Sequence, residues 1–143
     1  MNIAIGADHA GFSLKEEIKK YLGKTNAHHL IDKGTYSDDS VDYPDFAHPV
    51  AESVAGKECD AGILICGSAN GVAITANKHK GIRAAVCWTE EIASLARKHN
   101  NANIICIPSR FVSKELAKKM TGIFLTEPFE KGRHEKRVEK INS

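Results

Sequence analysis

The sequence GILICGSANG at residues 62–71 decides the fold class. Its first half is a short, continuous apolar run that ends at Cys66, which is typical of a strand buried on both faces of a parallel sheet. Its second half is a glycine-rich turn, and we expect a helix to begin just after Gly67. The stretch therefore predicts a strand–turn–helix unit, from which α/β folds are built.

Similar apolar runs recur on both sides of this stretch, separated by segments with helical periodicity. The predicted strands are residues 3–7, 28–32, 62–66, 82–87 and 103–107. Strands that alternate with helices favour repeated βα units and a parallel sheet. We therefore predict a three-layer α/β/α Rossmann-like fold with a five-stranded parallel sheet, formed by residues 1–143 as a single domain.

Apolar residues at helical spacing predict the helices between and after these strands. In the first helix, Ser13 and Glu16 form a capping-box pattern, and the second helix begins near Pro44, which suits a first helical turn. Other apolar stripes are Ile92 with Leu95 and Ala96, Leu116 with Met120, Ile123 and Phe124, and Val138 with Ile141. Because the last stripe is thin, we expect the C-terminal helix to lie against a partner subunit and to be used in dimerisation.

Composition excludes several classes of function. A net charge of +2 over 143 residues is too small to indicate a nucleic-acid partner. No segment approaches the roughly 20 apolar residues of a membrane span, and no basic leader follows Met1, so we expect a cytoplasmic protein. No C-x-x-C pair occurs, and we expect reduced thiols at Cys59, Cys66, Cys87 and Cys106.

Residues with useful chemistry follow three of the predicted strands. Asp8 and His9 come after the first strand, Cys66 and the glycine-rich turn end the third, and Arg110 follows the fifth. Ligands of open parallel sheets bind at the carboxyl ends of the strands, so these residues are expected to converge. The amides and dipole of the helix that follows Gly67 should attract an anion and lower the pKa of Cys66.

The residues alone also allow plainer interpretations. Cys66 could be a core thiol, and the Asp8-His9 pair could be a solvated turn with Asp8 as a cap. His99 continues an apolar stripe and could be a satisfied core histidine. Arg133 and Arg137 share one helical face, where they could grip a phosphate or simply face solvent.

Eight short segments are far more specific together than any one motif. They are GADHAGF at 6–12, DKGT at 32–35, DYP at 42–44, CGS at 66–68, ANK at 76–78, GIRA at 81–84, HN at 99–100 and GRH at 132–134. In this combination the chain resembles, from end to end, the ribose-5-phosphate isomerase B family. That family also contains galactose-6-phosphate isomerase subunits.

The resemblance implies an enzyme of the non-oxidative pentose phosphate pathway that interconverts ribose 5-phosphate and ribulose 5-phosphate through an enediolate. It implies no cofactor and no metal. Cys66 would be the base and His99 would assist ring opening. Asp8 and His9 would hold the sugar near its ring oxygen. The remaining implied contacts are Ser68 and the amides of Gly67, Ala69, Asn70 and Gly71 at the enediolate oxygen, and Asn100, Arg110, Arg133 and Arg137 at the substrate, the arginines chiefly at its phosphate.

The resemblance also implies a homodimer in which each active site is shared. His99, Asn100, Arg133 and Arg137 would then come from the neighbouring subunit, and dimers could pair further into tetramers. Two alternatives stay open: an isomerase of galactose 6-phosphate or allose 6-phosphate, and a catalytically silent module that binds a sugar phosphate.

Two positions depart from the family pattern. One branch of the family has a glutamate base where this chain has Val72, which leaves Cys66 as the base. Ala69 stands where the family usually has glycine, so if that residue needs a positive φ, its methyl group would strain the turn or narrow the pocket. Two rival classes also lack their chemistry here: a receiver domain needs an aspartate at position 66, and a cysteine phosphatase needs an arginine at position 72.

Overall fold

The computed structural model describes residues 1–141, in which five strands and six helices follow one another. The strands are β1 (Asn2–Ala7), β2 (His29–Asp32), β3 (Ala61–Cys66), β4 (Ala84–Val86) and β5 (Ile104–Pro108). The helices are α1 (Phe12–Gly23), α2 (Pro44–Ala55), α3 (Asn70–Ala76), α4 (Glu90–Lys98), α5 (Lys114–Thr126) and α6 (Arg133–Ile141).

The five strands form one parallel sheet in the order β2-β1-β3-β5-β4, which confirms the predicted α/β class. From β1 the chain passes to β2 on one side, and it then returns to β3 on the other side. The strand order therefore changes direction between β1 and β3. In parallel sheets, a crevice for ligands opens at the carboxyl ends of such strands.

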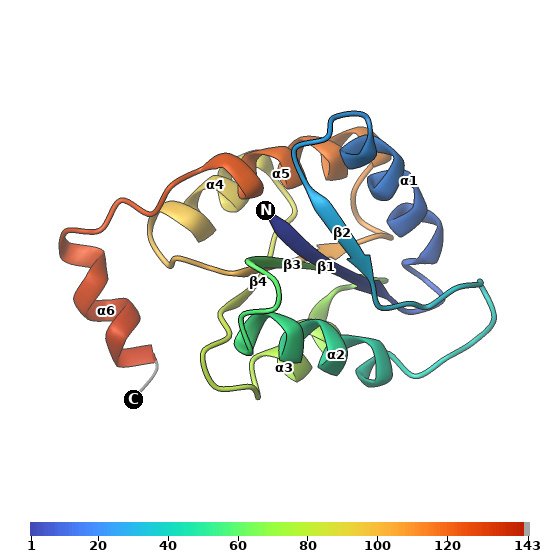
Figure 1. Cartoon of the computed structure of the whole chain (residues 1–143), viewed down its shortest axis with the longest axis horizontal. Helices are drawn as coiled ribbons and strands as arrows, with labels where there is room; N and C mark the ends of the chain where they lie inside the picture. The colour runs from blue at the N-terminus through green and yellow to red at the C-terminus, as the bar shows by residue number, and fades with distance from the viewer. Residues whose placement is uncertain (142–143) are drawn as a thin grey trace.

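Helices cover both faces of the sheet (Figure 1). Helices α1, α4 and α5 pack on one face, and α2 and α3 pack on the other. Alternate residues of β3 serve the two cores, with Ile63 and Ile65 in the first and Leu64 and Cys66 in the second. This explains why the strand is apolar throughout, since both of its faces are covered. Among residues 1–141, no helix is both long and apolar enough to cross a membrane.

Helix α6 projects from one end of the molecule (Figure 1). Its apolar stripe is as thin as the sequence predicts, because Val138 is buried while the side chain of Ile141 is 56% exposed. Arg133 and Arg137 are also exposed on this helix. Tertiary packing within the chain therefore covers little of α6.

The start of α1 differs from the prediction. The helix is capped at Gly11 without a side-chain hydrogen bond, and Ser13 lies inside the first turn, so the capping-box prediction was wrong. The turn is closed upstream instead, where the Asp8 carboxylate accepts hydrogen bonds from the amides of Ala10 (3.0 Å) and Gly11 (3.1 Å). A Cβ at Gly11 would lie 2.3 Å from the carbonyl oxygen of Ile65, so only glycine fits there.

Strand β4 is shorter than the predicted residues 82–87 and lies at one edge of the sheet. Side-chain amides take the place of a neighbouring strand here. The amide of Ala84 donates to Oδ1 of Asn77 at 2.8 Å, and Nδ2 of Asn77 donates to the carbonyl of Ala84 at 2.9 Å. On the other side, toward β5, the amide of Arg83 donates to Oδ1 of Asn103 at 2.8 Å.

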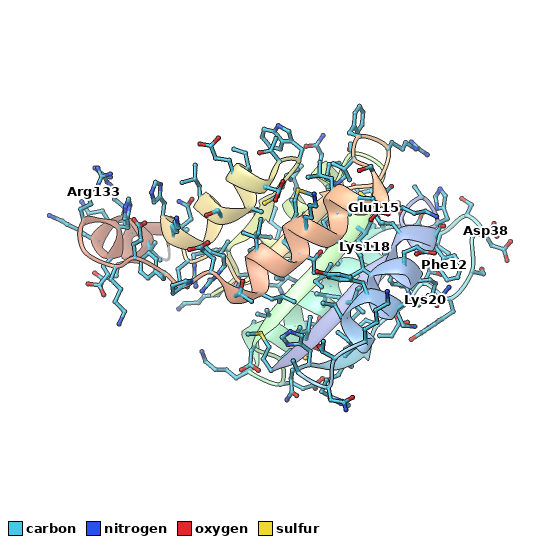
Figure 2. All side chains as sticks on the ribbon, turned by 90° about the horizontal axis from the view of Figure 1, so that it is seen from above. Phe12, Lys20, Asp38, Glu115, Lys118 and Arg133 are labelled. Atoms are coloured by element: carbon cyan, nitrogen blue, oxygen red, sulfur yellow. The ribbon has the colours of Figure 1, made fainter. Side chains whose placement is uncertain are left out.

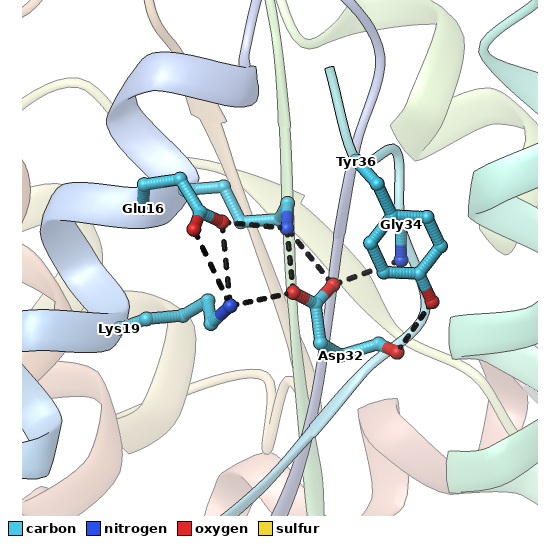
Figure 3. A network of polar contacts seen from close by, with 6 residues as sticks. Glu16, Lys19, Asp32, Gly34 and Tyr36 are labelled. Carbon is cyan, nitrogen blue, oxygen red and sulfur yellow. Dashed lines mark hydrogen bonds and ion pairs between the residues drawn. The ribbon is translucent and has the colours of Figure 1, made fainter.

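A partly buried ion-pair network joins α1 to the end of β2 (Figure 3). The Lys15 side chain is 0% exposed, and its Nζ donates to both carboxylate oxygens of Asp32 at 2.9 and 2.7 Å and to Glu16 at 2.9 Å. Lys19 adds a bond to Asp32 at 2.8 Å, and the amide of Gly34 donates to the same carboxylate at 2.9 Å. Burial opposes the charge on Asp32, but these hydrogen bonds outweigh it and lower the pKa of its carboxyl group.

Candidate functional site

A cavity of about 270 Å³ opens at the carboxyl ends of β1, β3 and β5. The predicted convergence of the turns that follow these strands is therefore confirmed. Hydrogen bonds fix the turns to one another: Ser109 donates through its amide to Cys66 at 2.9 Å and through Oγ to Ala10 at 2.9 Å. The cavity is lined by Asp8, His9, Ala10, Tyr43, Cys66, Gly67, Ser68, Gly71 and Arg110.

Cys66 is the last residue of β3 and combines burial with access to this cavity. The residue is only 5% exposed, yet it lines the cavity together with Asp8 and His9. Burial raises the pKa of its thiol, and the charge of Asp8 acts in the same direction. The amides of Val72, Ala69 and Ser68 lower the pKa, but by less. The expectation of a lowered pKa was therefore wrong for the isolated chain, since desolvation of the thiolate outweighs the amides.

The turn after Cys66 contains the strain that the sequence predicts. Ala69 has φ 63° and ψ 0°, the left-handed conformation that favours glycine, and it is fully buried. An alanine held there costs about 1 kcal/mol relative to a relaxed backbone. Because this residue must turn the chain, α3 begins at Asn70 rather than directly after Gly67. The amide of Asn70 donates to Oγ of Ser68 at 3.4 Å, which leaves the Ser68 hydroxyl proton free to donate.

Asp8 and His9 are held by different contacts. Asp8 caps the turn before α1, as the plainer interpretation proposed, and it also lines the cavity. Nδ1 of His9 accepts a hydrogen bond from the amide of Val41 at 3.2 Å. A backbone amide can only donate, so the neutral imidazole must have its proton on Nε2. His9 can therefore offer a hydrogen-bond donor to a ligand.

Two glycines let large side chains approach the turn. A Cβ at Gly71 would lie 2.5 Å from the ring of Tyr43, and a Cβ at Gly67 would lie 3.1 Å from a guanidinium nitrogen of Arg110. Tyr43 was missed as a lining residue by sequence reasoning, although it belongs to the DYP segment at 42–44 that supports the family resemblance. An aromatic residue directly before a helix-starting proline was the available signal.

Ala69, in the turn, and Asn70, at the start of α3, lie beside this cavity but do not line it, and four other predicted site residues lie away from it within one chain. His99 caps the end of α4, five residues before β5 begins at Ile104, and Ile104 pairs with Gly62 at the amino end of β3. Cys66 stands at the other end of β3, about 13 Å away along the strand. His99 therefore lies near the amino ends of the strands, opposite the end at which the cavity opens. Its ring stacks on His134 of α6, with centroids 4.2 Å apart.

Asn100, Arg133 and Arg137 also lie away from the cavity. Asn100 lines a separate cavity of about 480 Å³ beside residues 77–85. Figure 2 places Arg133 at the opposite end of the molecule from Phe12, the first residue of α1, which follows the Asp8 turn. The structure thus brings together Asp8, His9, Cys66, Gly67, Ser68, Gly71 and Arg110, and it separates them from the four more C-terminal residues.

Comparisons with known proteins agree with the motifs. A family model described as Ribose/Galactose Isomerase matches residues 3–141. Ribose-5-phosphate isomerase B of Escherichia coli K12 is 48% identical over 141 residues, which cover 99% of this chain and 94% of that protein.

Two solved structures resemble this chain in both fold and sequence. A ribose 5-phosphate isomerase from Thermotoga maritima superimposes with a TM-score of 0.94 at 51% identity, covering 99% of this chain and 97% of that one. Ribose-5-phosphate isomerase B from Mycoplasma genitalium, whose structure holds ribulose-5-phosphate, gives a TM-score of 0.93 at 46% identity and covers 99% and 93%. The chain therefore belongs to the ribose/galactose isomerase family, as the resemblance of its motifs predicted.

Proposed function

We propose that this protein interconverts ribose 5-phosphate and ribulose 5-phosphate, with Cys66 as the base. One observation carries the proposal: a thiol at the end of a central strand faces a polar cavity beside helix-start amides. The curated relatives named ribose-5-phosphate isomerase B and the ribulose-5-phosphate held by the Mycoplasma genitalium protein support this choice of sugar.

The proposed proton transfer follows from this arrangement. The Cys66 thiolate takes the proton from C2 of the open-chain aldose, and the electron pair forms the C1–C2 double bond of an enediolate. The proton on sulfur, which can exchange with solvent while the enediolate persists, is then delivered to C1. The hydroxyl proton of O2 passes to O1, and the carbonyl forms at C2 to give the ketose. Charge that develops on the substrate oxygen needs donors already in place. The Ser68 hydroxyl can supply one, and so can the amide of Gly71, which lies in the first turn of α3 and has no acceptor within the helix.

His9 and Asp8 would hold the sugar at the other side of the cavity. The Val41 amide keeps the proton of neutral His9 on Nε2, so His9 can donate to a sugar oxygen while Asp8 accepts from a hydroxyl. Arg110 would bind the phosphate. A phosphate bound away from the reacting carbons supplies binding energy that positions them.

We propose further that the active site is completed by a second copy of the chain. In one chain Arg110 is the only arginine at the cavity among residues 1–141, whereas Arg133, Arg137, His99 and Asn100 stand elsewhere. A neighbour that lends these four residues would add charges for the phosphate and His99 for ring opening. The weakly covered helix α6 supports such an interface, and the four free thiols support a cytoplasmic location.

The direct test is an isomerase assay on the purified protein in the presence of a metal chelator. We expect conversion of ribose 5-phosphate to ribulose 5-phosphate, with a kcat/KM at least about tenfold above those for allose 6-phosphate and galactose 6-phosphate. A faster reaction with either hexose phosphate would favour the alternative sugar. A folded protein with no turnover of any of the three would reject the isomerase.

Shared sites predict complementation between two inactive variants. Cys66→Ala and Arg133→Ala subunits are each expected to be inactive alone. In a mixed dimer, one of the two sites draws both intact residues from opposite subunits. A random mixture should therefore regain about a quarter of the wild-type activity.

The measurement is the isomerase rate after the two variants are unfolded and refolded together, with mixed dimers verified by distinct affinity tags. A mixture of Cys66→Ala with a second Cys66 variant, Cys66→Ser, serves as the control and should stay inactive. Mixed dimers that form without regaining activity would place each complete site within one chain.

A further inference from the structure

Three metal-ligating side chains meet where the end of α4 faces the start of α6. Oε1 of Glu130 lies 3.8 Å from Nε2 of His99 and 3.7 Å from Nε2 of His134. One ligand atom from each of the three residues lies within 4.8 Å of the others. Within residues 1–141, no other group of three histidine, cysteine or acidic side chains reaches this proximity.

We propose that His99, Glu130 and His134 bind a Zn²⁺ ion. The bound ion would inhibit the enzyme because His99 could then no longer transfer a proton during ring opening. Two imidazole nitrogens with one carboxylate oxygen form a donor set that suits zinc and leaves a fourth position open for water. Harder ions such as Mg²⁺ prefer oxygen ligands alone, so the donor set argues against them.

The two nitrogen–oxygen distances fit a site that closes around an ion. Ligand atoms held about 2.0–2.1 Å from a tetrahedral zinc are about 3.3 Å apart. The two nitrogen–oxygen separations here are 3.7 and 3.8 Å, so each must shorten by about half an ångström. The Glu130 side chain is 49% exposed and that of His99 is 37% exposed, so both can move. The His134 side chain is only 9% exposed and provides the fixed ligand.

Backbone and side-chain contacts hold the three residues close to one another. The amide of Glu130 donates to the carbonyl of Lys98 at 3.1 Å, which fixes the segment before α6 against the end of α4. Glu127 strengthens the same junction, since Arg97 donates to its carbonyl at 3.1 Å and Ser94 to its carboxylate at 3.3 Å. The three side chains are therefore neighbours before any ion arrives, which reduces the entropy lost on binding. The stacked rings of His99 and His134, which lie 14° from parallel, must rotate so that both Nε2 lone pairs meet the ion.

The inhibition rests on the proposed function, whereas the binding does not. A zinc ion occupies the lone pair of Nε2 of His99, which can then neither accept nor deliver a proton during ring opening. Because the proposed dimer lends one His99 to each active site, one ion per chain would inactivate every site. The expectation that catalysis needs no metal is unaffected, since this ion only inhibits.

Zinc binding can be measured without substrate. Wild-type protein is titrated with Zn²⁺ in competition with a chromophoric chelator, and we expect one ion per chain. Glu130→Gln should weaken this binding at least about tenfold, and His134→Gln should abolish it. Glu135→Gln, an exposed position in the first turn of the same helix, is the matched control and should bind like the wild type. Circular dichroism verifies that each variant is folded.

A cysteine thiolate is the competing ligand, and two measurements separate it from the proposed site. Cys66→Ser should bind zinc with unchanged affinity, and the Co²⁺ derivative should lack the strong near-ultraviolet charge-transfer band of a cobalt–thiolate bond. Stoichiometric binding that survives both Glu130→Gln and His134→Gln, binding that is lost in Cys66→Ser, or no binding at all would overturn the site.

Inhibition is tested by the isomerase rate at a Zn²⁺ concentration ten times the measured Kd. The wild-type rate should fall about tenfold and recover with chelator, while Glu130→Gln should keep at least about half of its rate at the same concentration. Zinc bound at the site without loss of activity would overturn the inhibitory role. A protein that binds zinc but never isomerises a sugar phosphate would instead refute the proposed function.

Discussion

Replacement of Cys66 by alanine lowers kcat for isomerisation by about a thousandfold, because the proton transfer between C1 and C2 loses its base. Substrate affinity should change little, since the phosphate and the sugar hydroxyls are held by other residues. The proton transfer itself is measured by NMR as exchange of solvent deuterium into the sugar, and this exchange should stop in Cys66→Ala.

Cys59→Ala is the matched control for this substitution. Cys59 is also a buried free thiol, but it lies outside the cavity, so its removal should leave kcat unchanged. Deuterium exchange that continues in Cys66→Ala at the wild-type rate would remove Cys66 from the role of base.

The same thiol sets a pH dependence. Because burial raises the pKa of Cys66, the thiolate is the minor form at neutral pH, and its fraction grows as pH rises. The logarithm of kcat/KM should therefore rise with a slope near one per pH unit until the pH passes the thiol pKa. A pH profile already flat at neutral pH would contradict the raised pKa in the working enzyme.

Replacement of Lys15 by methionine should lower the free energy of unfolding by about 3 kcal/mol. Its ammonium group is fully buried against Asp32, so its removal leaves a half-buried carboxylate without its main partner. Lys19→Met is the matched control: Lys19 also bonds Asp32, but its side chain is 32% exposed, so its loss should cost less than about 1 kcal/mol. Urea denaturation of both variants measures the difference.

The network also predicts the direction of an acid effect. The pKa of Asp32 is lowered in the folded protein, so its stabilisation is complete above the unfolded value of about 3.9. It is lost as pH falls through the folded pKa. Between pH 5 and acid unfolding, the free energy of unfolding should therefore fall less in Lys15→Met than in the wild type. The difference between the two losses should be about equal to the amount by which the variant is less stable at neutral pH. Parallel losses in the two proteins would show that Lys15 does not lower the Asp32 pKa.

The sequence determined the architecture because its signals were local. The buried strands β1, β3 and β5 are continuous apolar runs, and the rule for parallel sheets then located the turns after them at one edge. Ala69 could be singled out because the family that the chain resembles usually has glycine there, and glycine is favoured where φ is positive. None of these inferences required knowledge of how deeply a particular atom is buried.

The parts that were missed depend on such depth or on contacts distant in sequence. The sign of the Cys66 pKa shift is set by a balance between burial and three amides, which a residue pattern does not reveal. Gly11, rather than Ser13, is the N-cap of α1, and this position must be glycine because the carbonyl of Ile65 passes close to it. Tyr43 reaches the cavity only because α2 and the turn before α3 approach one another in space.

The pairing of Asn77 with Ala84 has a consequence for the behaviour of the protein at high concentration. β4 is an edge strand, and an edge strand offers free amides and carbonyls that can template a strand from another molecule and start aggregation. Both backbone groups of Ala84 that point outward are already occupied by the Asn77 side chain. A strand from a neighbouring chain would first have to displace this side chain. Asn77 therefore opposes polymerisation through pairing of edge strands.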